Sequence, residues 1–133
     1  MSLNELLPKA VRLYPEKEAV VCGDLRMDYQ SFARRVWQLS HALMGLGITK
    51  NDRIAIVQEN THEFLETYLA SAHLGSILVP LNHRLSTREL SMILEDSQSR
   101  ILISQSAFSE KVQGLPAKLP GIEQIIWTRP END

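Results

Sequence analysis

One stretch of the sequence decides the fold: Gly75-Ser-Ile-Leu-Val-Pro-Leu-Asn-His-Arg-Leu-Ser-Thr-Arg-Glu-Leu90. It opens with an apolar run that has the length and composition of a short buried strand. Three polar side chains follow that strand: Asn82, His83 and Arg84. Ser86 and Glu89 then stand three residues apart, which is the spacing of a capping box at a helix start. The stretch therefore predicts a buried strand that leads through a polar turn into a helix.

The same alternation of strand and helix extends on both sides of this stretch. Apolar runs at 53–57, 77–79, 101–103 and 124–127 predict four strands. The helix between the first two strands is expected to start at Asn60, with Glu63 completing a capping box, and to stop at Gly75. Its predicted buried face is Leu65, Tyr68, Leu69 and Ala72. The next helix turns Leu90, Ile93 and Leu94 inward, and a weaker helix is expected near 107–112.

The first 47 residues predict a different set of elements. We expect a helix over 4–13 and a hairpin whose strands, 19–22 and 25–27, are joined by a tight Gly23-Asp24 turn. The spacing of Phe32, Val36, Leu39, Leu43 and Leu46 then predicts an amphipathic helix, with Asp28 as its N-terminal cap and Gly47 at its end.

Strands that are continuous Val/Ile/Leu runs and alternate with helices indicate a parallel sheet. The expected fold is therefore α/β, with a three-layer, mostly parallel Rossmann-like sheet, helices on both faces and a small N-terminal β-hairpin. A length of 133 residues, without a low-complexity tract or charge block, predicts a single domain over 1–133.

Composition narrows the class of function. A net charge of −2 gives no basic surface for nucleic acid, and the few aromatic residues are scattered. The longest uncharged stretch contains Gly75 and Pro80 and falls short of the roughly 20 apolar residues that a transmembrane helix needs. One cysteine, Cys22, and an N-terminus without the pattern of a signal peptide indicate a cytoplasmic protein.

The candidate ligand-binding residues follow the end of the second predicted strand. Ligands of open α/β sheets bind at the carboxyl ends of strands, near helix N-termini, and Asn82, His83 and Arg84 follow such an end. Arg84 has two interpretations: a phosphate-binding guanidinium supported by free backbone N–H groups, or a surface arginine loosely paired with a carboxylate. Glu63 and Glu66 are expected to face solvent. The four histidines lack paired metal spacing, and no catalytic motif is visible, so we predict neither a metal site nor catalytic residues in this chain.

A series of short motifs carries a family resemblance. The series contains 15–19 (Pro-Glu-Lys-Glu-Ala), 28–32 (Asp-Tyr-Gln-Ser-Phe), 46–55 (Leu-Gly-Ile-Thr-Lys-Asn-Asp-Arg-Ile-Ala), 69–75 (Leu-Ala-Ser-Ala-His-Leu-Gly), 79–84 (Val-Pro-Leu-Asn-His-Arg) and 89–97 (Glu-Leu-Ser-Met-Ile-Leu-Glu-Asp-Ser). In this order, the motifs resemble the N-terminal part of the adenylate-forming, AMP-binding enzymes. The resemblance is greatest to the acyl-CoA synthetases, which are fatty-acid or aryl-acid CoA ligases, and it covers nearly the whole chain.

The resemblance implies a two-step ligase that uses ATP, Mg²⁺ and CoA. An acid and ATP form an acyl-adenylate and pyrophosphate, and CoA then takes the acyl group as a thioester. The family's phosphate loop, ribose-binding aspartate and C-terminal lysine domain lie further along the chain than Asp133. The resemblance therefore implies that this chain is a fragment that is inactive alone. Within the ligase it would serve as a scaffold for the active site and form one edge of the CoA entry. Its partner would be the remainder of the ligase, and the resemblance also implies a role in long-chain fatty acid metabolism.

One site residue can be carried over from the family. In some CoA ligases the arginine of an Asn-Pro-Arg turn contacts the phosphate-bearing nucleotide end of CoA, and Arg84 matches it. Asn82 and His83 complete the motif, although His83 stands where proline is usual. A second hypothesis is a free-standing α/β binding or interaction module without catalysis. The apolar run at 125–127, close to the chain end, is evidence against this second hypothesis, and it predicts that the isolated chain self-associates through an exposed sheet edge or apolar patch.

Overall fold

The computed structural model describes residues 1–128, which form two compact units. The first contains 1–51 and 60–76, and the second contains 52–59 and the chain from 77 onward. The chain passes between the units three times, so neither unit is built from one uninterrupted stretch of sequence. The expectation of a single domain over 1–133 is not decided by this division and stays a prediction.

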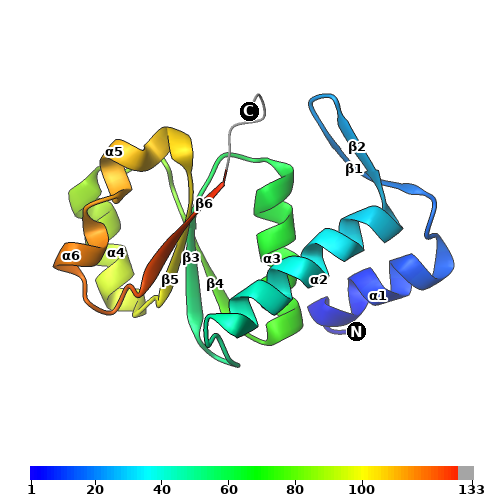
Figure 1. The fold of residues 1–133 in the computed structure, drawn as a ribbon, viewed down its shortest axis with the longest axis horizontal. Coiled ribbons are helices and arrows are strands. Elements are labelled where there is room, and N and C mark those ends of the chain that lie inside the picture. The colour runs from blue at the N-terminus through cyan, green and yellow to red at the C-terminus, as the bar shows by residue number, and fades with distance from the viewer. Residues whose placement is uncertain (129–133) are drawn as a thin grey trace. The chain divides into compact units, whose positions relative to one another are not determined.

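The second unit is built on a four-stranded parallel sheet (Figure 1). Its strand order is β4-β3-β5-β6. The elements of this unit, in chain order, are β3 (Arg53–Val57), β4 (Ile77–Leu81), α4 (Thr87–Ser97), β5 (Ile101–Gln105), the 3₁₀ turn η1 (Ser106–Phe108), α5 (Ser109–Val112), α6 (Leu115–Lys118) and β6 (Gln124–Thr128). The four predicted strands and the helix after Ser86 are confirmed.

The central strands form the core of this unit. Residues 54–57 of β3 and 101–104 of β5 are buried, as expected for strands paired on both edges. Figure 1 shows α4, α5 and α6 together on one side of the sheet. Their apolar side chains pack on those of the strands in one cluster: Ala55, Val57, Leu81, Leu90, Leu94, Leu102, Val112, Leu115 and Ile122. Ile93, expected to point inward, is instead exposed, because Leu90 and Leu94 already fill the inward stripe of α4.

β4 lies at the edge of the sheet and runs two residues beyond the predicted 77–79. It contains Pro80, whose backbone has no N–H to donate. An edge strand tolerates proline because one of its sides has no strand to pair with. The strand therefore carries the chain to Asn82 at the carboxyl edge of the sheet.

The first unit contains three helices and the predicted hairpin. Its elements are α1 (Leu3–Leu13), β1 (Glu18–Cys22), β2 (Leu25–Asp28), α2 (Tyr29–Gly45) and α3 (His62–Leu74). β1 and β2 pair antiparallel in a two-stranded sheet. The backbone of Gly75 is left-handed, with φ of +72°, and a side chain there would lie 3.3 Å from Lys50, so glycine is needed where α3 ends. The α/β fold with a parallel sheet and an N-terminal hairpin is thus confirmed.

The predicted start and buried face of α3 were wrong. Thr61, not Asn60, is the N-terminal cap, and no side chain closes a capping box there. Leu65 and Tyr68 are 41% and 42% exposed, whereas the buried positions are Glu66, Thr67, Ala70 and Ser71. These polar side chains tolerate burial because they are hydrogen-bonded; the Thr67 hydroxyl, for example, donates to the carbonyl of Glu63 at 2.7 Å.

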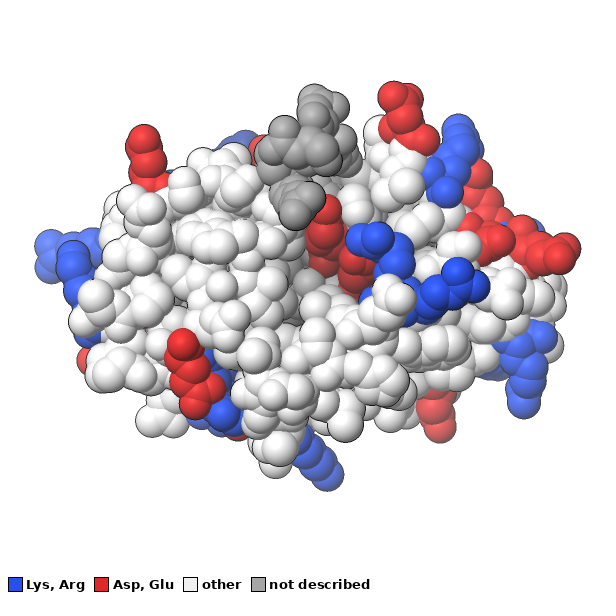
Figure 2. Space-filling model, in the orientation of Figure 1, with Lys and Arg blue, Asp and Glu red and all other residues white. Residues whose placement is uncertain are grey.

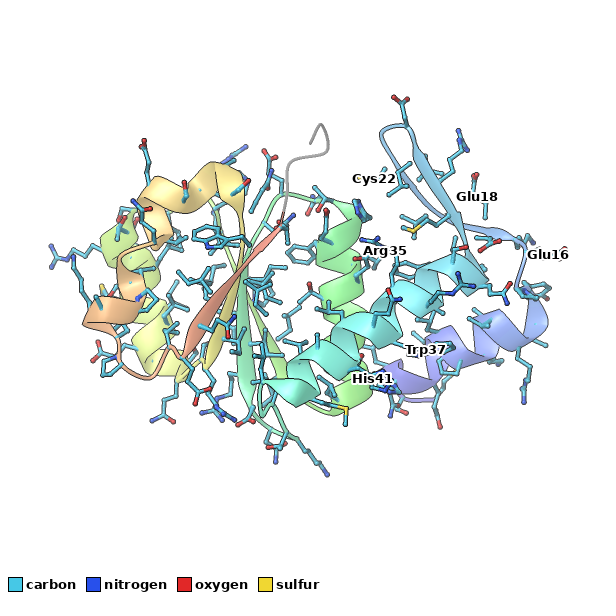
Figure 3. All side chains as sticks on the ribbon, in the orientation of Figure 1. Glu16, Glu18, Cys22, Arg35, Trp37 and His41 are labelled. Carbon is cyan, nitrogen blue, oxygen red and sulfur yellow. The ribbon has the colours of Figure 1, made fainter. Side chains whose placement is uncertain are left out.

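Glu66 was also expected to face solvent, and this was wrong. Glu66 is only 5% exposed, and its carboxylate accepts hydrogen bonds from the Arg35 guanidinium of α2, including one of 3.3 Å. Figure 3 shows Arg35 at the side of α2 that faces α3. The ion pair raises the pKa of Arg35 above its ordinary value, chiefly through the hydrogen bond to Glu66. A paired carboxylate can be buried where a lone one could not.

Within residues 1–128, each helix is too short or too polar to span a lipid bilayer.

The cap of α2 leads to a prediction about pH. Asp28 accepts a hydrogen bond from the backbone N–H of Ser31 at 2.8 Å, which lowers the pKa of Asp28 below its ordinary 3.8. A lowered folded-state pKa means that the cap stabilises the fold above pH 3.8 and that this contribution is lost as the pH falls through the folded-state pKa. Asp28→Ala should therefore be less stable than the wild type at pH 7, and the difference should shrink below pH 3.8.

Urea unfolding followed by circular dichroism at a series of pH values measures this difference. Asp28→Asn is the matched control, because asparagine caps helices without titrating, and its stability relative to Asp28→Ala should not change with pH. A difference between wild type and Asp28→Ala that is the same at pH 7 and pH 3 would contradict the assignment of Asp28 as a charged cap.

Candidate functional site

The turn after β4 is shaped by Asn82. Its side-chain oxygen accepts a hydrogen bond from the backbone N–H of Arg84 at 2.9 Å, and its carbonyl accepts one from Leu85 at 3.1 Å. Such a side-chain-to-backbone bond, two residues along, is the Asx turn that asparagine commonly forms. Asn82 therefore holds the loop on which Arg84 stands, and its amide oxygen is engaged inside the turn.

His83 is fixed by residues that follow the neighbouring part of the sheet. Its ring stacks on the ring of Phe108, with centroids 5.0 Å apart and planes 19° from parallel. Its carbonyl accepts a hydrogen bond from the Lys111 ammonium at 2.7 Å, and that ammonium lies 5.9 Å from the Phe108 ring centroid. The loops after β4 and β5 thus meet at the carboxyl edge of the sheet. The stacking and the bond to Lys111 restrain a turn in which proline would otherwise limit the backbone.

Arg84 itself is exposed at the tip of this restrained turn. Its guanidinium makes no ion pair or side-chain hydrogen bond with any other residue among 1–128. Arg100, in the same unit, contrasts with it, since its guanidinium contacts Asp52 at 2.6 Å and Glu123 at 3.0 Å. Within the described part of the chain, the interpretation of Arg84 as a surface arginine paired with a carboxylate therefore finds no carboxylate.

The N-terminus of α4 is already occupied, which corrects the idea that its backbone would help Arg84 to bind an anion. Ser86 and Glu89 form the predicted capping box: the Ser86 amide donates to the Glu89 carboxylate at 2.8 Å, and the Glu89 amide donates to the Ser86 hydroxyl at 3.2 Å. The bond from the Ser86 amide lowers the pKa of Glu89, so the group is negatively charged at neutral pH. That charge satisfies the helix start and opposes a second anion there.

Amide side chains link the other strand exits at the same edge. Gln58, buried after β3, accepts a hydrogen bond from the Thr128 hydroxyl at 2.7 Å. Gln105, at the end of β5, accepts one from the backbone N–H of Glu59 at 3.1 Å and donates one to the Glu59 carboxylate at 3.2 Å. The edge is therefore held by cross-links within the chain, with Arg84 at its β4 end.

Sequence reasoning missed Phe108 and Lys111, which the weakly helical segment after β5 presents one turn apart. It also missed an open groove of about 610 Å³ in the first unit, beside His62 and Cys22. Among residues 1–128, no three His, Cys, Asp or Glu side chains gather closely enough to hold a metal ion. On the face drawn in Figure 2, the described lysines and arginines are interspersed with acidic residues rather than joined in one basic patch.

The chain matches a known family over most of its length. The model of the family described as AMP-binding enzyme matches residues 7–131. A 4-hydroxybutyrate–CoA ligase of Metallosphaera sedula is 29% identical over 126 residues, which are 95% of this chain and 23% of that protein. A feruloyl-CoA synthase of an Amycolatopsis species is 35% identical over 109 residues, 82% of this chain and 22% of that protein.

Solved structures agree with the sequence comparisons. A fatty acyl CoA synthetase of Mycobacterium tuberculosis superposes with a TM-score of 0.90 at 28% identity, over 96% of this chain and 26% of that one. An anthranilate CoA ligase superposes with a TM-score of 0.91 at 23% identity, which is evidence for the fold alone. This chain spans about a quarter of the length of the relatives that it matches.

Proposed function

The chain belongs to the AMP-binding enzyme family, and on that premise we propose that it is the N-terminal part of an acid–CoA ligase. The observation that carries this proposal is that the family model matches 7–131 while the CoA ligases matched are about four times longer. The intact enzyme would use ATP to convert a carboxylic acid into an acyl-adenylate, with release of pyrophosphate. CoA would then displace AMP and form the acyl-CoA thioester.

Among acids, a long-chain fatty acid is our first choice. A ligase of M. tuberculosis named for medium- and long-chain fatty acids is 24% identical over 133 residues, 100% of this chain.

We also propose that the ligase acts in the cytoplasm, where ATP and CoA are plentiful, and that residues 1–133 form one domain within it. The three chain crossings between the two units support that single domain.

The cofactors of the intact enzyme would be ATP, Mg²⁺ and CoA. The described residues offer no site that could hold a metal ion by itself, because no three His, Cys, Asp or Glu side chains gather among them. The metal would therefore be held with ATP by other parts of the ligase. Within this chain, the group that suits one of these molecules is the Arg84 guanidinium.

We assign Arg84 to a phosphate of the nucleotide end of CoA. A guanidinium offers phosphate a planar fork of donors, and that of Arg84 is exposed and uncommitted among residues 1–128. Asn82 shapes its turn from within, and the contacts of His83 with Phe108 and Lys111 restrain that turn from the side. Asn82 and His83 would thus support the contact through the backbone rather than touch CoA themselves.

Arg84→Ala in the intact ligase should raise the KM for CoA about 10- to 100-fold. This range corresponds to the roughly 1.5–3 kcal/mol of a hydrogen bond to a charged group. Adenylation precedes CoA binding, so acid-dependent exchange of pyrophosphate into ATP should stay within about twofold of the wild type. Arg88→Ala is the matched control, because Arg88 is an exposed arginine on α4, and it should leave the KM for CoA unchanged. Equal losses in both half-reactions, or in neither, would remove Arg84 from the CoA site.

The isolated 133-residue chain should not catalyse adenylation. At the described sheet edge, Gln58 and Gln105 are engaged in cross-links within the chain, and Arg84 is assigned above to CoA rather than to ATP. Purified chain, incubated with ATP, Mg²⁺ and a panel of carboxylic acids, should release no acid-dependent pyrophosphate above a buffer control. Release that scales with the concentration of pure chain would overturn the proposal that it acts as a scaffold.

The partners we propose are the remainder of the ligase and, for the isolated chain, further copies of itself. β4 and β6 are edge strands of the described sheet, and Trp127 on β6 is exposed. Light scattering should therefore show particles larger than a monomer at high protein concentration, and fewer of them for Trp127→Lys. Met92→Lys, which changes an exposed apolar residue of α4, should have no effect. A monomer at every concentration would contradict self-association.

A free-standing α/β binding module is the second candidate function. It is favoured by one observation, that the amide side chains at the described sheet edge are engaged in hydrogen bonds within the chain. One experiment separates the two candidates. It asks whether a protein made of this chain and the remainder of the proposed ligase forms acyl-CoA from acid, ATP and CoA. Acyl-CoA formation would exclude the second candidate.

A further inference from the structure

The groove of the first unit lies between the hairpin and the start of α3. It has a volume of about 610 Å³ and is lined by residues 20–23 from β1 and its turn, and by 60–62, 64, 65 and 68. Neither β2 nor the Arg84 turn contributes to it. The groove therefore shares no lining residue with the CoA contact proposed for Arg84.

β1 presents its edge to this groove. Successive side chains of a strand point to opposite faces, yet four residues in a row, 20–23, border the groove. A groove in contact with both side-chain orientations runs along the backbone edge of the strand. Among residues 1–128, β1 pairs with β2 alone, in a two-stranded sheet. Two-stranded hairpins are marginally stable in water, so further packing against this edge would stabilise the element.

The groove exposes large apolar side chains. Val21 on β1 is 52% exposed, and Leu65 and Tyr68 lie one turn apart on α3 with about two fifths of each exposed. Apolar groups gathered in one hollow gain free energy when another apolar surface removes them from water. No lysine or arginine lines the groove. This composition disfavours carboxylate or phosphate ligands and favours an uncharged, largely apolar occupant.

His62 also requires a hydrogen-bonding group from whatever occupies the groove. Its side chain is only 10% exposed, and its Nδ1 is buried without a hydrogen-bond partner among the described residues. Its Nε2 lies 3.3 Å from the Glu63 carboxylate, which places a proton on Nε2. In the neutral ring Nδ1 is then an acceptor. Since buried acceptors are nearly always paired, the occupant should bring an N–H or O–H donor.

We propose that this groove receives an extended polypeptide segment from the remainder of the ligase. An extended segment suits a strand edge, can place apolar side chains on Leu65 and Tyr68, and carries backbone N–H donors for His62. About three quarters of the matched ligases lie outside the part aligned with this chain, so polypeptide is available to cover the groove. The inference rests on the proposed function, because it requires that remainder.

Alkylation of Cys22 tests the proposal, since the only cysteine of the chain lies in the groove lining. Figure 3 labels this side chain on the hairpin. The alkylation rate of Cys22 by iodoacetamide, followed by peptide mass spectrometry, should be at least about tenfold lower in the intact ligase than in the isolated chain. Leu65→Lys in the intact ligase should restore most of that rate, because burying a lysine charge in the apolar contact would disfavour binding of the segment. Met92→Lys, which changes an exposed residue that is not part of the groove lining, should restore none of it.

Equal alkylation rates in the intact ligase and the isolated chain would overturn the proposal. Protection that arises in the isolated chain only as its concentration increases would also overturn it, by showing that the occupant is a second copy. If Leu65→Lys does not fold, amide hydrogen exchange of residues 20–23 and 60–62 in the two unaltered proteins decides the question, with slower exchange expected in the intact ligase. The labelling readout does not depend on catalysis, so an intact protein that forms no acyl-CoA would overturn the proposed function separately.

Discussion

The pairing of β3 between β4 and β5 is the constraint on which the rest of the second unit depends. Residues 54–57 have no exposed surface, so β3 can lie only in the middle of the sheet, and its polar backbone must pair on both sides. Because the three strands are parallel, their carboxyl ends fall at one edge. The loop after β4 thereby meets the loop after β5, and His83 stacks on Phe108.

That meeting of loops explains how an exposed arginine is held without a partner of its own. The Arg84 turn is closed by Asn82 from within and by Lys111 from the side, while Ser86 and Glu89 satisfy the helix that follows. These polar groups are engaged within the chain, and the guanidinium is left for solvent or a ligand. The arrangement suits a residue that contributes charge to a site completed by other parts of a ligase.

Much of the fold could be predicted from the sequence, because β3 and β5 are short continuous apolar runs and Asp28, Gly75 and Ser86 mark helix ends with specific chemistry. The buried face of α3 could not, since Glu66 is buried only through its ion pair with Arg35, 31 residues away. The positions of Asn82, His83 and Arg84 followed from the strand end. The roles of Phe108 and Lys111, and the groove beside His62, depend on contacts between distant segments that no local pattern encodes.

The coding sequence beyond the Asp133 codon tests most directly whether this chain is the scaffold part of a longer acid–CoA ligase. The proposed function predicts that the reading frame continues beyond this codon for roughly three times the present length, as in the matched ligases. It also predicts a Ser/Thr/Gly-rich loop ending in Pro-Lys, as the family resemblance implies. A stop codon directly after Asp133 would contradict the claim and leave a free-standing α/β module.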